Sequence, residues 1–317
     1  MTPLPPPLET APPPRRARWG LIVLAALLFV AAAAGLWTYV RLPDARGLAN
    51  ENPPTTSLIE HRAEEAREAG KKPRRRQQWV PLKRISRVAV AAVLLSEDAS
   101  FYQHEGVDTV ELQKAFEKAM EERELGRGAS TITQQLAKNL WLSNDRSLWR
   151  KAKELVLARR LEDALTKPRI LTLYLNVVEW GQGVYGIEAA ALEHFGVHAS
   201  ELTAAQGAML ASMLPSPRKR LPRARPLVLQ KHALRLIARM AAVKRLSPEQ
   251  ALEARTELER FFGRSTAPAA EQEEQEEEVA VEPVAAPETA PSAPVETEQE
   301  PEEAPAPAEA IEEAPAL

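Results

Sequence analysis

The stretch that most constrains the fold of this chain is Trp19–Val40, 22 residues without a charged side chain. A helix needs about 20 such residues to cross a bilayer, and Trp19, Trp37 and Tyr39 stand near the ends of the run, where interfacial aromatic residues are enriched. The run therefore predicts a transmembrane helix over residues 19–40. The Pro/Arg-rich segment 1–18 favours a cytoplasmic N-terminus, with the bulk of the chain on the other side. A cleaved signal peptide is the alternative, although its apolar core usually spans only about 7–15 residues.

Charge divides the rest of the chain. Residues 265–317 hold 16 Glu and no Asp, Lys or Arg, so they carry −16, and residues 1–264 carry +13 because the whole chain carries −3. A folded part this basic indicates an anionic partner such as nucleic acid, lipid head groups or phosphates. The acidic tail, rich in Pro and Ala and without aromatic residues, is predicted to be disordered. The chain has no cysteine, which excludes disulfides and thiolate chemistry.

Helix signals dominate between the apolar run and the tail. Residues 41–78 are polar and predict a linker, and residues 79–264 predict a single globular domain. Helices are expected after Ser86 and over residues 131–142, 146–165, 166–176, 188–195, 204–214 and 227–244, with Thr131 and Gln134 at the spacing of a capping box. No run alternates as a strand would, so the sequence predicts a mainly α fold.

Three short motifs are better explained by structure than by chemistry. Residues 181–186, GQGVYG, match a dinucleotide fingerprint, but no strand–helix alternation surrounds them, and a glycine turn between two helices is favoured. Ser216 and Lys219 match S-x-x-K without a following K-T-G. His194 and His198 have the spacing of zinc ligands, but no acidic third ligand lies nearby in the sequence, which favours a surface or packing role.

Glu97 and Asp98 follow the apolar segment 85–95. Negative charge at a helix C-terminus opposes the helix dipole. The pair therefore indicates either a solvated helix end or a functional site.

A second candidate region runs from residue 126 to residue 154. A glycine-flanked Ala-Ser-Thr run opens the helix that carries Lys138, and its first N–H groups are predicted to point outward, as at an anion site. In the next helix Arg146, Arg150, Lys153 and Glu154 share one face, because they are spaced i, i+4, i+7 and i+8. Side chains of these types could cradle a diphosphate. A solvated basic face with an i,i+4 salt bridge is the alternative.

Taken together, these blocks resemble the peptidoglycan glycosyltransferase family, which comprises the polymerase domain of class A penicillin-binding proteins and its monofunctional, membrane-anchored form. The shared motifs are E-D-x-x-F-x-x-H-x-G-x-D from Glu97, G-A-S-T-I-T-Q-Q-L-A-K-N from Gly128, R-K-x-x-E from Arg150, I-L-x-x-Y-L-N from Ile170 and a glycine–alanine block over 186–196. No transpeptidase domain follows. The chain departs from the family in the long segment before Trp79, in His194 where Tyr is usual, and in the acidic tail.

The resemblance implies a lysozyme-like glycosyltransferase domain at the cytoplasmic (inner) membrane. It implies that lipid II is polymerised into β-1,4-linked glycan strands with inversion and release of undecaprenyl diphosphate, for cell wall biosynthesis. The expected partners are lipid II, the glycan strand, the membrane and, through the tail, other cell-wall synthesis proteins, with no nucleic acid. No resident metal or cofactor is implied, although a divalent cation (Mg²⁺ or Mn²⁺) could accompany the diphosphate.

The resemblance also assigns residues. Glu97 is implied to be the catalytic base and Glu154 the second catalytic carboxylate. The residues implied for the donor and its diphosphate are Lys138, Arg146, Lys153, Arg150, Gly128, Ser130, Gln135 and Asn139. Asp98, Phe101 and His104 are expected to shape the loop after Glu97.

Two other functions fit part of this pattern. A glycan-cleaving enzyme of lysozyme-like fold would use Glu97 as a general acid, but it would have no need of a basic diphosphate cradle. A catalytically silent scaffold would recruit cell-wall enzymes through its tail, but it would not need Glu97 and Glu154.

Overall fold

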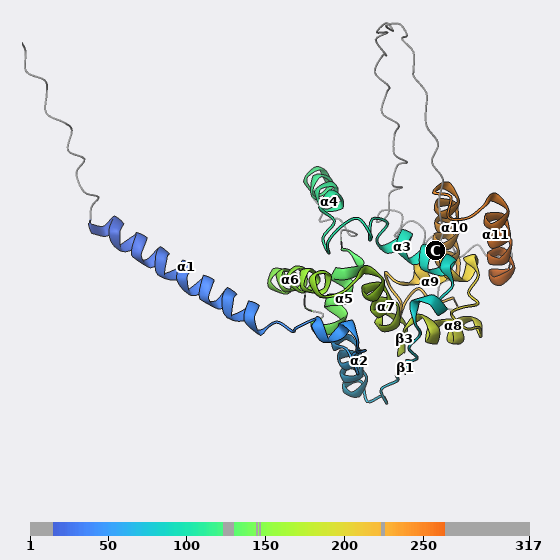
Figure 1. The fold of residues 1–317 in the computed structure, drawn as a ribbon, viewed down its shortest axis with the longest axis horizontal. Coiled ribbons are helices and arrows are strands. Elements are labelled where there is room, and N and C mark those ends of the chain that lie inside the picture. Colours follow the sequence, from blue (N-terminus) through green and yellow to red (C-terminus); the bar gives the residue numbers. More distant parts are fainter. Residues whose placement is uncertain (1–14, 123–129, 144, 146, 223–225, 264–317) are drawn as a thin grey trace, which may run out of the picture. The chain divides into compact units, whose positions relative to one another are not determined.

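The computed structural model describes residues 15–122, 130–143, 145, 147–222 and 226–263, and within them the chain is mainly α, as predicted (Figure 1). The helices are α1 Arg15–Arg41, α2 Ser57–Glu68, α3 Arg87–Glu97, α4 Thr109–Glu122, α5 Ile132–Trp141, α6 Leu148–Ala164, α7 Lys167–Val177, α8 Ile187–Phe195, α9 Ala204–Met213, α10 Pro226–Ala242 and α11 Pro248–Phe262, with short 3-10 turns at Arg46–Ala49 and Leu82–Arg84. The strands are β1 Arg76–Gln77, β2 Glu179–Gly181 and β3 Val184–Tyr185. The predicted disordered tail lies outside the described residues.

One hydrophobic core joins the helices that carry the motifs. Helix α3 packs on α9 and α10, while α5 packs on α6 and α7. The α3–α9 contact is close because Gly207 of α9 lies against Ala89 of α3, where a Cβ on the glycine would stand 2.7 Å from the Ala89 Cα. This packing fixes the end of α3, and with it the position of Glu97.

The helix boundaries follow local capping chemistry. Helix α6 begins at Leu148, two residues later than predicted, because the Ser147 hydroxyl accepts the Arg150 N–H at 3.1 Å. Thr131 caps α5 by accepting the Gln134 N–H at 3.2 Å. The Gln134 side chain does not complete the predicted capping box, because its amide donates to the Gly106 carbonyl at 3.1 Å. Ser86 precedes α3, as predicted, but its hydroxyl makes no capping bond.

The glycine-rich residues 181–186 connect α7 to α8, as predicted, and also form part of a small sheet. Strands β2 and β3 pair antiparallel, and β1 pairs parallel to β3 in the order β1-β3-β2. Gly183 has φ +71°, and a Cβ there would lie 2.6 Å from the Arg74 carbonyl oxygen, so the approach of the segment leading into β1 requires glycine. Strands of two or three residues are too short to show an alternating pattern.

The predicted linker over residues 41–78 is instead part of the folded domain. Ala45 and Ile59 are buried, α2 packs on α5, and β1 joins the sheet. The segment reads as polar because its charged side chains bind the domain: Arg62 pairs with Glu179 at 2.8 Å, and Arg74 with Glu193 at 2.8 Å. The domain therefore begins well before Trp79.

Helix α1 is, among the described residues, the one helix long and apolar enough to cross a membrane, a test that an N-terminal signal sequence also passes. Its described apolar side chains are largely exposed, including Leu27, Phe29 and Val40. Arg160 of α6 donates to the Tyr39 and Leu42 carbonyls at 2.6 and 2.7 Å, which ties the end of α1 to the domain.

Candidate active site

Glu97 is the last residue of α3 and is half-buried where the apolar helix ends. Burial raises the pKa of the Glu97 carboxyl above its ordinary value, an effect partly offset by hydrogen bonds from Gln135 and Ser96 and by the charge of Arg220. A carboxylate in this state is a stronger base than one in water.

The neighbour that orients this carboxylate is Gln135 of α5. Its amide nitrogen Nε2 donates to Glu97 Oε2 at 2.8 Å, and its Oε1 accepts the Tyr174 hydroxyl at 3.0 Å. Burial raises the pKa of Tyr174 well above its usual value, so the phenol keeps its proton and acts as the donor. The Gln135 oxygen must then accept, which turns the amide NH₂ toward Glu97.

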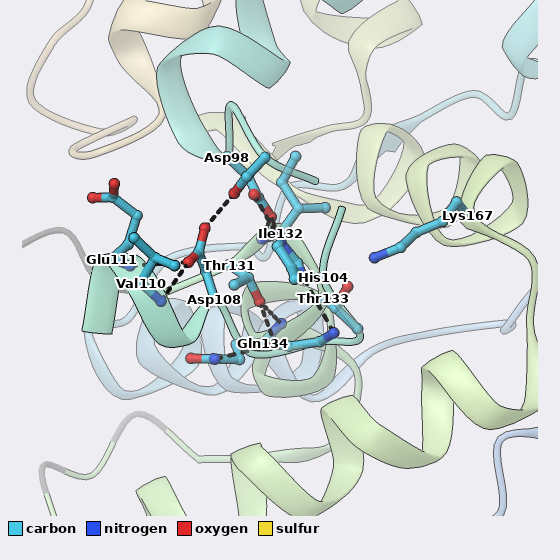
Figure 2. A network of polar contacts seen from close by, with 12 residues as sticks. Asp98, His104, Asp108, Val110, Glu111, Thr131, Ile132, Thr133, Gln134 and Lys167 are labelled. Atoms are coloured by element: carbon cyan, nitrogen blue, oxygen red, sulfur yellow. Dashed lines mark hydrogen bonds and ion pairs between the residues drawn. The ribbon is translucent and has the colours of Figure 1, made fainter. Parts of the chain in front are cut away.

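The loop after Glu97 is built around Asp98. Figure 2 shows the buried Asp98 carboxylate between His104, whose Nε2 lies 2.9 and 3.0 Å from its two oxygens, and the Ile132 N–H, which donates to Oδ2 at 2.9 Å. Asp98 therefore holds the first turn of α5. The Thr131 hydroxyl donates to the Gly106 carbonyl at 2.7 Å and joins the far end of the loop to the same turn.

This geometry corrects the predicted anion site at the start of α5. Its first-turn N–H groups do not point outward to a ligand, because Ile132 N donates to Asp98 and Gln134 N donates to Thr131. A carboxylate of the protein already complements the positive end of the helix dipole.

Phe101 lies within the same loop and is buried, with 1% of its surface exposed. The Lys167 ammonium of α7 stands over its ring, 4.4 Å from the centroid, and donates to Glu162 Oε1 at 2.8 Å. Asp98 thus binds the start of α5, His104 binds Asp98, and Phe101 contacts Lys167 of α7. All three residues help to hold the loop after Glu97 in place.

The cationic part of the site surrounds Glu154 of α6, of which 3% is exposed. One carboxylate oxygen pairs with Arg150, and the other with Lys151 at 2.5 Å. The Lys151 ammonium also donates to Ser130 Oγ at 2.9 Å and to Gln134 Oε1 at 2.8 Å. Lys151 therefore links α6 to the start of α5.

Within this cluster, Lys138 is the cation that makes no hydrogen bond or ion pair with any of the described residues. Its half-buried ammonium has a lowered pKa, first because of desolvation and then because of the nearby charges of Arg150, Lys151 and Arg62, while Glu154 raises it. The charges near Lys138 are thus three cations and one carboxylate whose oxygens are already paired. An anionic ligand would relieve this excess of positive charge.

The base and the cations meet on α5. Gln135, which contacts Glu97, and Lys138, which lies near Glu154, are three positions apart in the sequence, so they share one face of the helix with Cβ atoms about 5–6 Å apart. One face of α5 therefore carries both a residue that binds the Glu97 carboxylate and a lysine that lies near Glu154.

The structure does not bring all of the predicted residues into this cluster. Lys153 lies over the Trp149 ring, 5.9 Å from its centroid, and no contact joins it to Glu154. Asn139 is buried on α5, and Ser130 is reached through Lys151. Gly128 and Arg146 lie outside the described residues.

Three residues that bind or lie near the candidate site residues were not singled out from the sequence: Lys151, Tyr174 and Arg62. Lys151 and Tyr174 stand inside the quoted motifs R-K-x-x-E and I-L-x-x-Y-L-N, which was the available signal. Arg62 had no such signal, because it lies in the segment predicted to be a linker.

A mainly α domain that carries a half-buried carboxylate and a cationic cluster along the same helix has the groups needed by one class of protein, the enzymes that transfer a glycosyl group from an anionic donor. The family model described as transglycosylase matches residues 63–241. The chain belongs to this transglycosylase family and is a glycosyltransferase with a lysozyme-like domain.

Curated relatives agree with this assignment. The "Biosynthetic peptidoglycan transglycosylase" of Janthinobacterium sp. (strain Marseille) is 44% identical over 198 residues, which cover 62% of this chain and 81% of that protein. The protein of the same name from Bordetella pertussis is 43% identical over 211 residues, covering 65% and 87%. That of Nitrosospira multiformis is 46% identical over 167 residues, covering 53% and 73%.

Proposed function

We propose that this protein is a peptidoglycan glycosyltransferase of cell wall biosynthesis that polymerises lipid II into β-1,4-linked glycan strands. The relatives bear the name of this activity, and the motifs that resemble the family carry the site. The observation that carries the proposal is the position of Glu97, hydrogen-bonded to the same face of α5 that presents the unpartnered Lys138.

Glu97 is the proposed general base. The 4-hydroxyl of the acceptor sugar loses its proton to the Glu97 carboxylate as the oxygen attacks the anomeric carbon of the donor. The bond from that carbon to the α-linked diphosphate breaks on the opposite face, so the new linkage is β. The raised pKa of Glu97 favours proton capture, and Gln135 keeps the carboxylate oriented.

The cationic cluster is the proposed site of the leaving diphosphate. Undecaprenyl diphosphate departs with its negative charge and needs charge stabilisation more than a proton. Lys138 is the free cation for this role, and Glu154 holds Arg150 and Lys151 in place on either side of its carboxylate. Ser130 and Gln135 are proposed donor-side residues that contact Lys151 and Glu97. The other donor-side residues remain proposed on the resemblance alone: Arg146, Lys153, Gly128 and Asn139.

A divalent cation would enter with the substrate diphosphate. Both oxygens of Glu154 are engaged in ion pairs, so we do not expect this carboxylate to hold a metal before the substrate arrives. Lipid II extension measured with and without a chelator, and after addition of Mg²⁺ or Mn²⁺, tests whether the diphosphate needs a metal.

The localisation follows from α1 and the substrate. We propose a single-pass inner-membrane protein with its N-terminus inside and its catalytic domain in the periplasm, where it meets a lipid-linked donor in the plane of the membrane. Reporter fusions placed after residues 14 and 263 test this orientation.

We also propose that the acidic tail binds other cell-wall synthesis proteins, so its deletion is expected to leave synthesis in vitro unchanged.

The test of the proposed reaction is incubation of the purified protein with lipid II and, separately, with finished peptidoglycan. We expect lipid II to be extended into strands and the finished polymer to stay intact. Cleavage of the polymer without extension of lipid II would contradict the proposal and favour a lysozyme-like hydrolase.

A further inference from the structure

Arg62 and Glu179 form an ion pair between two segments far apart in the sequence. Arg62 lies on α2 and Glu179 on β2, and the Arg62 Nε donates to Glu179 Oε2 at 2.8 Å. Glu179 is 3% exposed, and the side chain of Arg62 is 23% exposed. A second carboxylate, Glu65 of α2, accepts from Arg62 Nη1 at 3.0 Å. The guanidinium is therefore held from two sides.

One edge of this guanidinium is left unused. Nε and Nη1 make the bonds described above, while Nη2 makes no hydrogen bond to any residue of the described ranges. An arginine offers five N–H donors in a rigid fork, so the free Nη2 can donate to an oxyanion without loss of the Glu179 pair.

Arg62 also belongs to a helix that contacts α5, the helix that carries Lys138. Helix α2 packs on α5, and the Ser57 hydroxyl of α2 donates to the Leu142 carbonyl at the end of α5, at 2.9 Å. The Arg62 charge is near enough to Lys138 to act on its ammonium. Arg62 is thus a cation of the same neighbourhood, although it comes from a different helix.

A purely structural pair would explain this arrangement less well. A salt bridge that only fastened α2 to the small sheet would gain nothing from standing beside Lys138, because like charges in a partly desolvated place repel one another. The four cations Lys138, Arg150, Lys151 and Arg62 outnumber the three carboxylates that face them, which are Glu154, Glu179 and Glu65. A bound anion would attract each of these cations and so offset the repulsion among them.

We propose that Arg62 is a further donor-binding residue, which donates through Nη2 to the phosphoryl oxygens of the lipid-linked diphosphate, and that Glu179 is the positioning residue that holds it there. The inference rests on the proposed function. It assigns to α2, a segment that the sequence presents as a spacer, one wall of the donor site.

The first experiment measures lipid II binding and steady-state kinetics with the full chain. Arg62→Met is expected to raise the lipid II Kd and KM about tenfold, the loss of one charge-assisted hydrogen bond, with kcat changed less than about twofold. Arg62→Lys should restore part of the affinity, because it returns the charge without the fork. The matched control is Arg67→Met on the same helix, which should leave both values unchanged, since the one partner of the Arg67 side chain within the described ranges is the exposed Glu64.

The second experiment separates binding from folding. Arg62→Met leaves Glu179 buried without its partner, so the double variant Arg62→Met/Glu179→Gln removes that penalty, and thermal unfolding identifies variants that fold normally. Glu179→Gln alone should raise KM several-fold. In the Arg62→Met background it should add nothing, because its effect passes through Arg62. Additive effects in this double-mutant cycle would overturn the positioning role.

Lys138→Met, measured in parallel, distinguishes the two proposals. Failure of the wild-type protein to extend lipid II would contradict the proposed function itself. A second outcome would contradict only the assignment of Arg62. In that outcome the wild type extends lipid II and Lys138→Met binds it weakly, but Arg62→Met and the double variant bind lipid II as tightly as the wild type.

Discussion

The side-chain amide nitrogen of Gln135 donates to the Glu97 carboxylate at 2.8 Å. The Tyr174 hydroxyl donates to the amide oxygen of Gln135, and this second bond fixes which end of the amide faces Glu97. These hydrogen bonds connect the last residue of α3, through Gln135 of α5, with the buried Tyr174 of α7. They mean that the protonation of Glu97 depends on two residues that the reaction itself does not consume.

The first prediction concerns the pH dependence of the reaction. A general base must be deprotonated, so activity falls as pH falls through the pKa of Glu97. Because burial raises this pKa, the acid limb of the activity profile should lie at a higher pH than for an ordinary carboxyl group. The Gln135 hydrogen bond lowers that pKa, so Gln135→Leu should move the acid limb of the kcat/KM profile to higher pH. Tyr174→Phe should move it in the same direction by less. A limb that stays in place, or moves to lower pH, would argue against Glu97 as the titrating base.

The second prediction contrasts two lysines of α6. Lys151 contacts Glu154, Ser130 and Gln134, whereas Lys153 lies over Trp149. Lys151→Met should lower kcat/KM for lipid II about 10- to 100-fold, because it removes a cation and frees one oxygen of a buried carboxylate. Lys153→Met is the comparison, and its effect should be clearly smaller, because Lys153 lies over Trp149 and makes no contact with Glu154. The reverse ranking of the two variants would favour the arrangement expected from helix spacing.

The third prediction concerns Asp98 as the cap of α5. Asp98→Asn should lower the free energy of unfolding by about 1–3 kcal/mol, because a buried carboxylate that caps a helix N-terminus and pairs with His104 is lost. Urea unfolding measures the change. Ser86→Ala serves as the control, since the Ser86 hydroxyl makes no capping bond to α3, and its effect should stay within about 0.5 kcal/mol. Equal stabilities of Asp98→Asn and the wild type would contradict the capping role.

The helices could be predicted because their signals are local. Thr131 and the Thr166–Pro168 pair mark the starts of α5 and α7 within one or two residues of the observed boundaries. Ser247, Pro248 and Gln250 form a comparable signal before α11, with a complete capping box, although that helix was not predicted. Capping bonds span three residues, so the sequence contains both partners side by side.

The contacts that complete the site could not be predicted in this way, because their partners are distant in the chain. The Arg62–Glu179 pair joins residues 117 positions apart, and without Glu179 the α2 segment looks like solvated polar chain. The first turn of α5 looks like a free anion site until the loop from Asp98 folds over it. Helix spacing allowed both Lys151 and Lys153 near Glu154, and the contacts of Lys151 with the distant Ser130 and Gln134 show which lysine joins α6 to α5.

The fourth prediction uses Glu97 to separate activity from stability. Because burial raises the pKa of Glu97, the folded state holds the proton more tightly than the unfolded state does, and the ionised carboxylate therefore costs stability at neutral pH. Stability decreases as pH rises from the usual carboxyl pKa through the raised one. Glu97→Gln, which stays neutral, should have a Tm at pH 7 equal to or above that of the wild type, and the two should converge near pH 4. A lower Tm at pH 7 would contradict the raised pKa.

The most direct measurement for the whole account is glycan synthesis from purified lipid II by the wild type and by Glu97→Gln, with binding of lipid II measured on the same samples. The account predicts that Glu97→Gln binds lipid II with a Kd near that of the wild type, since the cationic cluster is intact, and that it forms no glycan strands. Strand synthesis by Glu97→Gln at a rate near that of the wild type would contradict the account, because another group would then have to accept the proton.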